Sequence, residues 1–88
     1  MKGSQDAALK QRLKAMVVAE ADKDVAPETI GDDEALFGPD ATLALDSIDG
    51  LQISMALQVQ FGARITDPKD LLRIMRSINT LADHLQPN

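Results

Sequence analysis

The chain begins with a segment in which apolar residues recur at the three- and four-residue spacing of an amphipathic helix. The stripe consists of Leu9, Leu13, Met16 and Val17. It predicts a first helix over about residues 4–22, with its apolar face directed inward. The basic residues of this segment lie off the stripe: Lys10, Arg12 and Lys14. We expect these three side chains on a solvated face.

A long connection follows over residues 23–46, because prolines and glycines interrupt any long regular element there. Its spaced apolar residues predict that it packs onto the core, with one helical turn near residues 33–37. These residues are Ile30, Leu36, Phe37, Leu43 and Leu45. Loops of this length are usually functional or disordered, and the apolar anchors favour the first.

A second helix is predicted over about residues 47–61, with Asp46 as its N-cap and Gly62 at its end. Its apolar positions form two ridges: Ile48, Leu51 and Met55 on one, and Ile53, Leu57 and Phe61 on the other. So wide an apolar arc is expected of a helix that contacts two neighbours or lines an internal cavity.

Two further helices complete the pattern. Pro68 after Asp67 predicts a short third helix over about residues 68–74, and Ser77 caps a last helix over about residues 77–86. No segment shows strand-like alternation. The sequence therefore predicts one all-α domain over residues 1–88, an antiparallel four-helix bundle with three main helices and a short third one.

Composition narrows the possible chemistry. With two Phe, no Trp, no Tyr and no Cys, the core must be aliphatic, and disulfides and thiolate metal sites are excluded. No apolar run approaches the roughly 20 residues of a membrane span, and the amphipathic start is unlike a signal peptide, so we expect a cytoplasmic protein. The net charge of −5 argues against nucleic acid as a partner and favours basic docking patches.

The charge pattern changes abruptly at one serine. Residues 24–49 contain eight acidic residues and no Lys or Arg, whereas residues 50–63 carry no charge at all. Ser47 lies at this boundary, between Asp46 and Asp49, at the predicted start of the second helix. A helix start presents unpaired N–H groups and the positive end of the dipole, so it suits an anion such as a phosphate esterified to Ser47.

The tripeptide Asp46-Ser47-Ile48 resembles the Asp-Ser-Leu or Asp-Ser-Ile motif of the acyl carrier protein family. The serine of that motif opens the second helix and carries a 4′-phosphopantetheine arm. Length, helix order and acidity agree with the family, and the resemblance extends from the first helix to Leu85. It implies that this chain is a carrier of acyl thioesters and not an enzyme, with the missing thiol supplied by the arm.

The resemblance also implies a set of partners and binding residues. Coenzyme A would donate the arm through a magnesium-dependent phosphopantetheinyl transferase. An acyl-activating enzyme or acyltransferase would load the carrier, and a ketosynthase would use its cargo. The carrier itself would be a monomer. The residues expected to contact partners are Asp46, Ile48, Asp49, Gln52 and Met55. Those expected to line an acyl pocket are Leu51, Ile53, Met55, Leu57, Phe61 and Leu72.

The sequence departs from the family pattern in the loop and in the second helix. Ala44 stands where many members have Gly, three residues before the serine, and the loop is a few residues longer than in the common fatty-acid form. The second helix of typical members is rich in Glu, but its polar positions here are Gln52, Gln58 and Gln60, with Val59 among them. These departures indicate a specialised carrier, in fatty-acid-type, polyketide-type or other lipid biosynthesis, that binds its own partner enzymes.

Other functions compete with this interpretation. The same arm could carry an amino acid, as in peptidyl or aminoacyl carriers, or the chain could be an unmodified acidic adaptor. A hydrolase built on Ser47, His84 and Asp46 is disfavoured because nothing places His84 beside Ser47. The acidic cluster of the loop lacks the spacing of a calcium-binding loop, so we expect no metal site.

Overall fold

The computed structural model describes residues 1–88 and contains helices but no strands. The four α-helices are α1 (Ala7–Glu20), α2 (Ser47–Phe61), α3 (Pro68–Ile74) and α4 (Ile78–Leu85). Two 3-10 helices, η1 (Gly3–Gln5) and η2 (Pro27–Thr29), precede and follow α1. The fold is the predicted all-helical bundle of four α-helices, of which α1 and α2 have 14 and 15 residues and α3 and α4 have 7 and 8.

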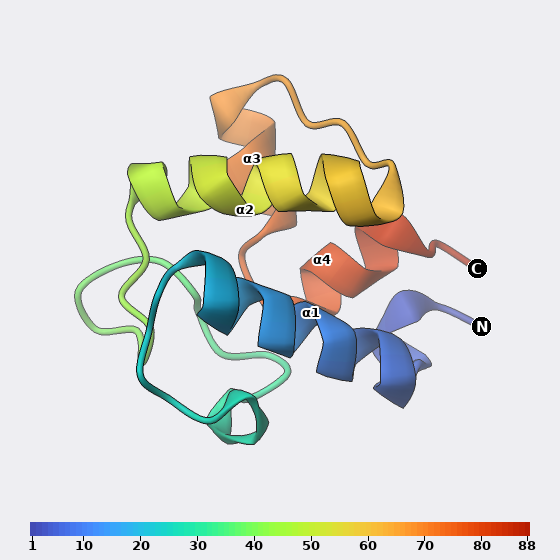
Figure 1. Cartoon of the computed structure of the whole chain (residues 1–88). Helices are drawn as coiled ribbons and strands as arrows, with labels where there is room; N and C mark the ends of the chain where they lie inside the picture. Colours follow the sequence, from blue (N-terminus) through green and yellow to red (C-terminus); the bar gives the residue numbers. More distant parts are fainter.

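The helices surround one aliphatic core. In Figure 1, α1 and α2 run in opposite directions, α3 crosses behind α2, and both chain ends lie beside the outer end of α4. The fully buried side chains include Leu13 and Val17 of α1, Ile53 and Leu57 of α2, and Ile78 and Leu81 of α4. The stripe predicted for the first helix therefore does face inward.

The first helix starts later than predicted. Its N-cap is Asp6, whose carboxylate accepts a hydrogen bond from the Leu9 N–H at 3.2 Å. Ser4 lies in η1 instead, and its N–H donates to the Asp83 carboxylate of α4 at 2.8 Å. Because Asp6 caps the helix, the residues before it are free to turn back onto α4, where Gly3 is buried against the backbone of Ala82.

The long loop between α1 and α2 is anchored as predicted. Ile30, Leu36, Leu43 and Leu45 are buried, and Phe37 is half-buried against the core. A short parallel bridge pairs Phe37 with Leu45. The predicted helical turn near residues 33–37 is absent.

Local interactions determine which segments of the loop between α1 and α2 form turns. Pro27 starts the 3-10 helix η2 earlier in the loop, and the Glu34 carboxylate accepts a hydrogen bond from the Gly31 N–H at 2.6 Å. Together with the Glu34 N–H, which donates to the Gly31 carbonyl at 3.4 Å, this bond closes a single turn over residues 31–34 that does not continue as a helix.

The expectation that Lys10 and Lys14 lie on a solvated face is wrong. Their ammonium groups lie 2.8 Å and 2.7 Å from the Asp32 carboxylate, and their side chains are only 15% and 14% exposed. The carbonyl of Asp32 also accepts a hydrogen bond from the Asn79 N–H, at 2.9 Å. Asp32 thus ties the acidic loop to α1 and to α4.

Arg12 is also engaged by a neighbouring side chain. Its guanidinium lies 4.6 Å from the centre of the Phe61 ring, at the end of α2. This distance is within the range of a cation–π interaction. Arg12 therefore links the exposed side of α1 to α2.

Candidate functional site

Ser47 is the first residue of α2, and another residue caps that helix. The Asp49 N–H donates to the Asp46 carboxylate at 2.9 Å, and the Asp46 N–H donates to the Asp49 carboxylate at 3.2 Å. This reciprocal capping box confirms the prediction that Asp46 is the N-cap. It leaves the exposed hydroxyl of Ser47 outside the capping interactions.

The helix start favours negative charge. The backbone N–H of Asp49 is the main cause that holds the pKa of Asp46 below its ordinary value of 3.8, and the N–H of Ile48 and the positive charge of Lys23 act in the same direction. The backbone N–H groups at this end of α2 thus favour a negative charge. A phosphate on Ser47 would meet the same field.

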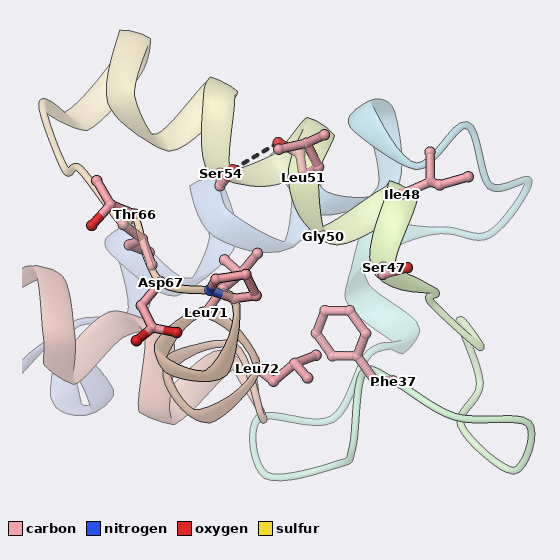
Figure 2. Close-up of a pocket in the computed structure, with 12 residues that line it drawn as sticks. Phe37, Ser47, Ile48, Gly50, Leu51, Ser54, Thr66, Asp67, Leu71 and Leu72 are labelled. Carbon is pink, nitrogen blue, oxygen red and sulfur yellow. Dashed lines mark hydrogen bonds between the residues drawn. The ribbon is translucent and has the colours of Figure 1, made fainter.

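An apolar groove of about 390 Å³ opens beside Ser47. It lies between α2, α3 and the loop that carries Phe37, and its apolar walls come from Phe37, Leu51, Ile65, Leu71 and Leu72. Figure 2 shows Ser47 at the end nearest Phe37, with Thr66 and Asp67 at the opposite end. The groove therefore offers an apolar surface that starts at the serine hydroxyl.

Gly50 forms part of the groove floor. A Cβ at this position would lie 3.3 Å from the Phe37 ring and 3.5 Å from Leu71, so the absence of a side chain lets both approach the first turns of α2. Glycine within a helix costs about 0.5–1 kcal/mol relative to alanine. Phe37, Gly50 and Leu71 were not among the residues expected in the pocket, although a glycine inside a helix is itself a signal of close packing.

The structure brings two of the six residues expected in an acyl pocket to this groove, Leu51 and Leu72. Ile53 and Leu57 are fully buried in the core instead. Phe61 packs under the Arg12 guanidinium, and Met55 is 58% exposed on another face of α2. The assignment of these six residues to an acyl pocket stays a prediction.

The residues expected to contact partners are mostly accessible. Asp46, Ile48, Gln52 and Met55 are exposed, and Asp49 is half-buried. Ile48 and Met55, which belong to the first of the two apolar ridges predicted for α2, are 68% and 58% exposed. This ridge is the uncovered side of the helix.

Ala44, three residues before Ser47, has a φ of +47°. The backbone position that glycine fills in many family members therefore keeps a left-handed conformation here. L-residues other than glycine rarely adopt it, because the Cβ approaches the following carbonyl.

The fold does not bring together the residues considered for hydrolysis, and it contains no metal-binding cluster. His84 is an exposed residue in the last turn of α4, in a depression shared with Arg73 and Arg76 that Ser47 does not line. No group of three or more His, Asp or Glu side chains is arranged to hold a metal ion. None of the helices has both the length and the apolar character needed to cross a membrane.

Comparison with known families agrees with the resemblance found in the sequence. A family model described as the phosphopantetheine attachment site matches residues 11–85. Searches of curated proteins and of solved structures found no match. The family model covers α2, α3 and α4 and the part of α1 from residue 11 onward, and the groove beside Ser47 fits a flexible, partly apolar arm. The chain therefore belongs to the phosphopantetheine attachment site family, whose members are non-catalytic carrier domains with a covalently attached 4′-phosphopantetheine.

Proposed function

We propose that Ser47 is the attachment residue and that the protein carries acyl groups as thioesters. The observation that carries this proposal is the position of the Ser47 hydroxyl, exposed at the start of α2, outside the capping box and at the end of the groove. A hydroxyl that caps no helix can be esterified without loss of a structural hydrogen bond.

The chain's own residues would orient the arm and not take part in chemistry. The N-terminus of α2 would favour the phosphate, and Leu51, Leu71 and Leu72 would cover apolar parts of the arm and its cargo. When bound, phosphopantetheine supplies the thiol that forms the thioester, since the chain has no Cys. Coenzyme A and a magnesium-dependent transferase would provide the group.

The carrier would serve a dedicated pathway in the cytoplasm, in fatty-acid-type, polyketide-type or other lipid biosynthesis. Gln52, Gln58 and Gln60 are exposed on α2, so the helix offers hydrogen-bonding side chains without charge. Long-range steering toward an acyltransferase, an acyl-activating enzyme or a ketosynthase then depends on the acidic loop and on Asp46 and Asp49.

An aminoacyl carrier is the second candidate. The end of the groove away from Ser47 is polar, with Ser54, Thr66 and the exposed Asp67 carboxylate, which could pair with an α-amino group. The apolar walls favour an acyl chain over this alternative. An unmodified adaptor would leave the groove without a role.

Mass spectrometry separates these functions. The protein is purified from a host that contains a phosphopantetheinyl transferase, and its intact mass and the mass released from its arm are measured. We expect the mass of the arm with an acyl thioester. A thioester-bound amino acid would establish the second candidate, and a bare chain that purified transferase and coenzyme A also leave unmodified would support an adaptor.

A further inference from the structure

A second depression, of about 380 Å³, lies where α3 passes into α4. Its charged and polar lining residues are Arg73, Arg76, Thr80, Asp83 and His84. It shares no lining residue with the groove beside Ser47. The depression is therefore a separate feature of the surface, which the attachment of an arm to Ser47 does not use.

The guanidinium groups of this depression are weakly engaged by the rest of the protein. The side chain of Arg76 forms no ion pair, and the hydrogen bond that an arginine side chain makes in this fold belongs to Arg73 instead. Arg73 pairs with Asp70 at 3.3 Å, but the two side chains are 72% and 54% exposed. An exposed pair of this kind contributes little, so both guanidinium groups are available to a ligand.

Free basic side chains are unusual in this chain, whose net charge is −5. Lys10 and Lys14 of α1 are both paired with Asp32. Arg12 lies over the ring of Phe61. An anion would be repelled by the acidic loop between α1 and α2, whereas at the depression it would meet two positive charges within one concave surface.

The backbone around the depression is held in place. The carbonyl of Arg76 accepts a hydrogen bond from the Leu36 N–H at 3.3 Å, and both sequence neighbours of Arg76 are buried. The hydroxyl of Thr80 donates to the Ile74 carbonyl at 2.9 Å, which joins the end of α3 to α4. Because the backbone is fixed, only side-chain freedom is lost when the arginines close on a ligand.

We propose that this depression binds a phosphate group, either free or carried by a small organic molecule. A guanidinium presents paired N–H donors that match the spacing of phosphate oxygens, and two guanidinium groups balance the charge of a dianion. The imidazole of His84 adds a further donor at the same depression. The Asp83 carboxylate opposes an anion least where it already accepts the Ser4 N–H, at 2.8 Å.

A bound phosphate would connect α3 to α4. Helix α3 has only 7 residues, and its Leu71 and Leu72 line the groove beside Ser47. A phosphate held by both Arg73 and Arg76 would restrain this short helix from the side opposite the groove. Since a ligand of the folded chain raises its stability, the effect is measurable without any arm on Ser47.

Nuclear magnetic resonance of the isotope-labelled full chain tests the proposal at neutral pH and constant ionic strength. The probes are inorganic phosphate, ribose 5-phosphate and acetate. We expect the amide signals of residues 73–84 to shift and saturate with phosphate at a Kd on the order of 1–10 mM, which two charge-assisted hydrogen bonds at exposed positions allow. Tighter binding of ribose 5-phosphate would identify the ligand as an organic phosphate, and equal or weaker binding would identify it as free phosphate.

Arg76→Gln should weaken phosphate binding at least about fivefold, because it removes one of the two guanidinium groups. The matched control is Arg64→Gln, which removes the same charge from an exposed position outside the depression and should change the Kd by no more than about twofold. Phosphate at about ten times the Kd should raise the Tm of the wild type and the control by at least about 3 °C, and that of Arg76→Gln by less than half as much.

Three results would overturn the proposal. Shifts that grow without saturation, or an equal rise in Tm for all three proteins, would show only a general effect of the ion on the protein surface. An affinity for acetate equal to that for phosphate would assign the depression to carboxylates. Saturable binding that Arg76→Gln leaves unchanged would place the phosphate outside the depression.

Discussion

Replacement of Ala44 by glycine should stabilise the protein. Ala44 has a φ of +47°, and a non-glycine L-residue in this left-handed region costs about 1–2 kcal/mol. Glycine removes that cost, but it makes the unfolded chain more flexible, which lowers the free energy of unfolding by about 0.4–1 kcal/mol. The Ala44 side chain is exposed, so its methyl group contributes little packing. The net gain is about 0.5–1 kcal/mol, or about 2–8 °C in Tm for a domain of this size.

Thermal and urea unfolding, followed by circular dichroism, measure this gain. The matched control is Ala35→Gly, at an exposed residue of the same loop whose φ is not positive, where the same substitution should destabilise by about 0.4–1 kcal/mol. The opposite signs distinguish relief of backbone strain from a general effect of glycine. Equal destabilisation by both variants would refute the strain at Ala44.

Three further perturbations follow from the structure. Two lysines of α1 hold the pKa of Asp32 below its ordinary value of 3.8. The stability that Asp32 contributes is therefore complete above that value and is lost as pH falls through the lower folded pKa. Asp32→Asn should flatten this acid limb, the fall in unfolding free energy at low pH, in urea unfolding at several pH values. Gly3→Ala should cost about 1–3 kcal/mol by urea unfolding, because a Cβ there meets the Ala82 backbone. Gln52→Glu with Gln58→Glu should strengthen binding to a ketosynthase with a basic docking surface, measured by anisotropy.

The first two of these have a matched control, and the third has a result that would contradict it. Asp24→Asn changes an acidic residue that forms no ion pair and should leave the acid limb as in the wild type. Gly31→Ala, where a Cβ meets only the Glu34 side chain at 3.7 Å, should cost less than about 0.5 kcal/mol. Wild-type affinity for the basic ketosynthase that already equals that of the double Glu variant would contradict a specialised carrier.

The sequence predicted the helices where local signals agree with tertiary packing. Asp46, Gly62, Pro68 and Ser77 mark the observed helix boundaries, because capping and turn chemistry act within a few residues. The start of α1 was misplaced for a tertiary reason. Ser4 can start a helix in isolation, but η1 instead packs against α4, a contact between the two ends of the chain.

The candidate site was predictable at Ser47 but not around it. Spacing alone finds two apolar ridges on α2 and does not say which one is covered, since that depends on where α1, α3 and α4 pack. Phe37 and Leu71 of the groove lie outside α2 in the sequence, so the apolar pattern of that helix does not reveal them. The Asp32 ion pairs could not be predicted for the same reason.

The most direct test of the account is the location of the modification in the intact protein. Wild-type protein is incubated with a phosphopantetheinyl transferase, magnesium and coenzyme A, and the modified residue is identified by fragmentation in a mass spectrometer, with Ser47→Ala as the paired sample. We expect one phosphopantetheine on Ser47 and none on a Ser47→Ala variant that keeps the wild-type helical spectrum. Attachment of the arm to the variant, or to another residue of the wild type, would contradict the assignment of Ser47.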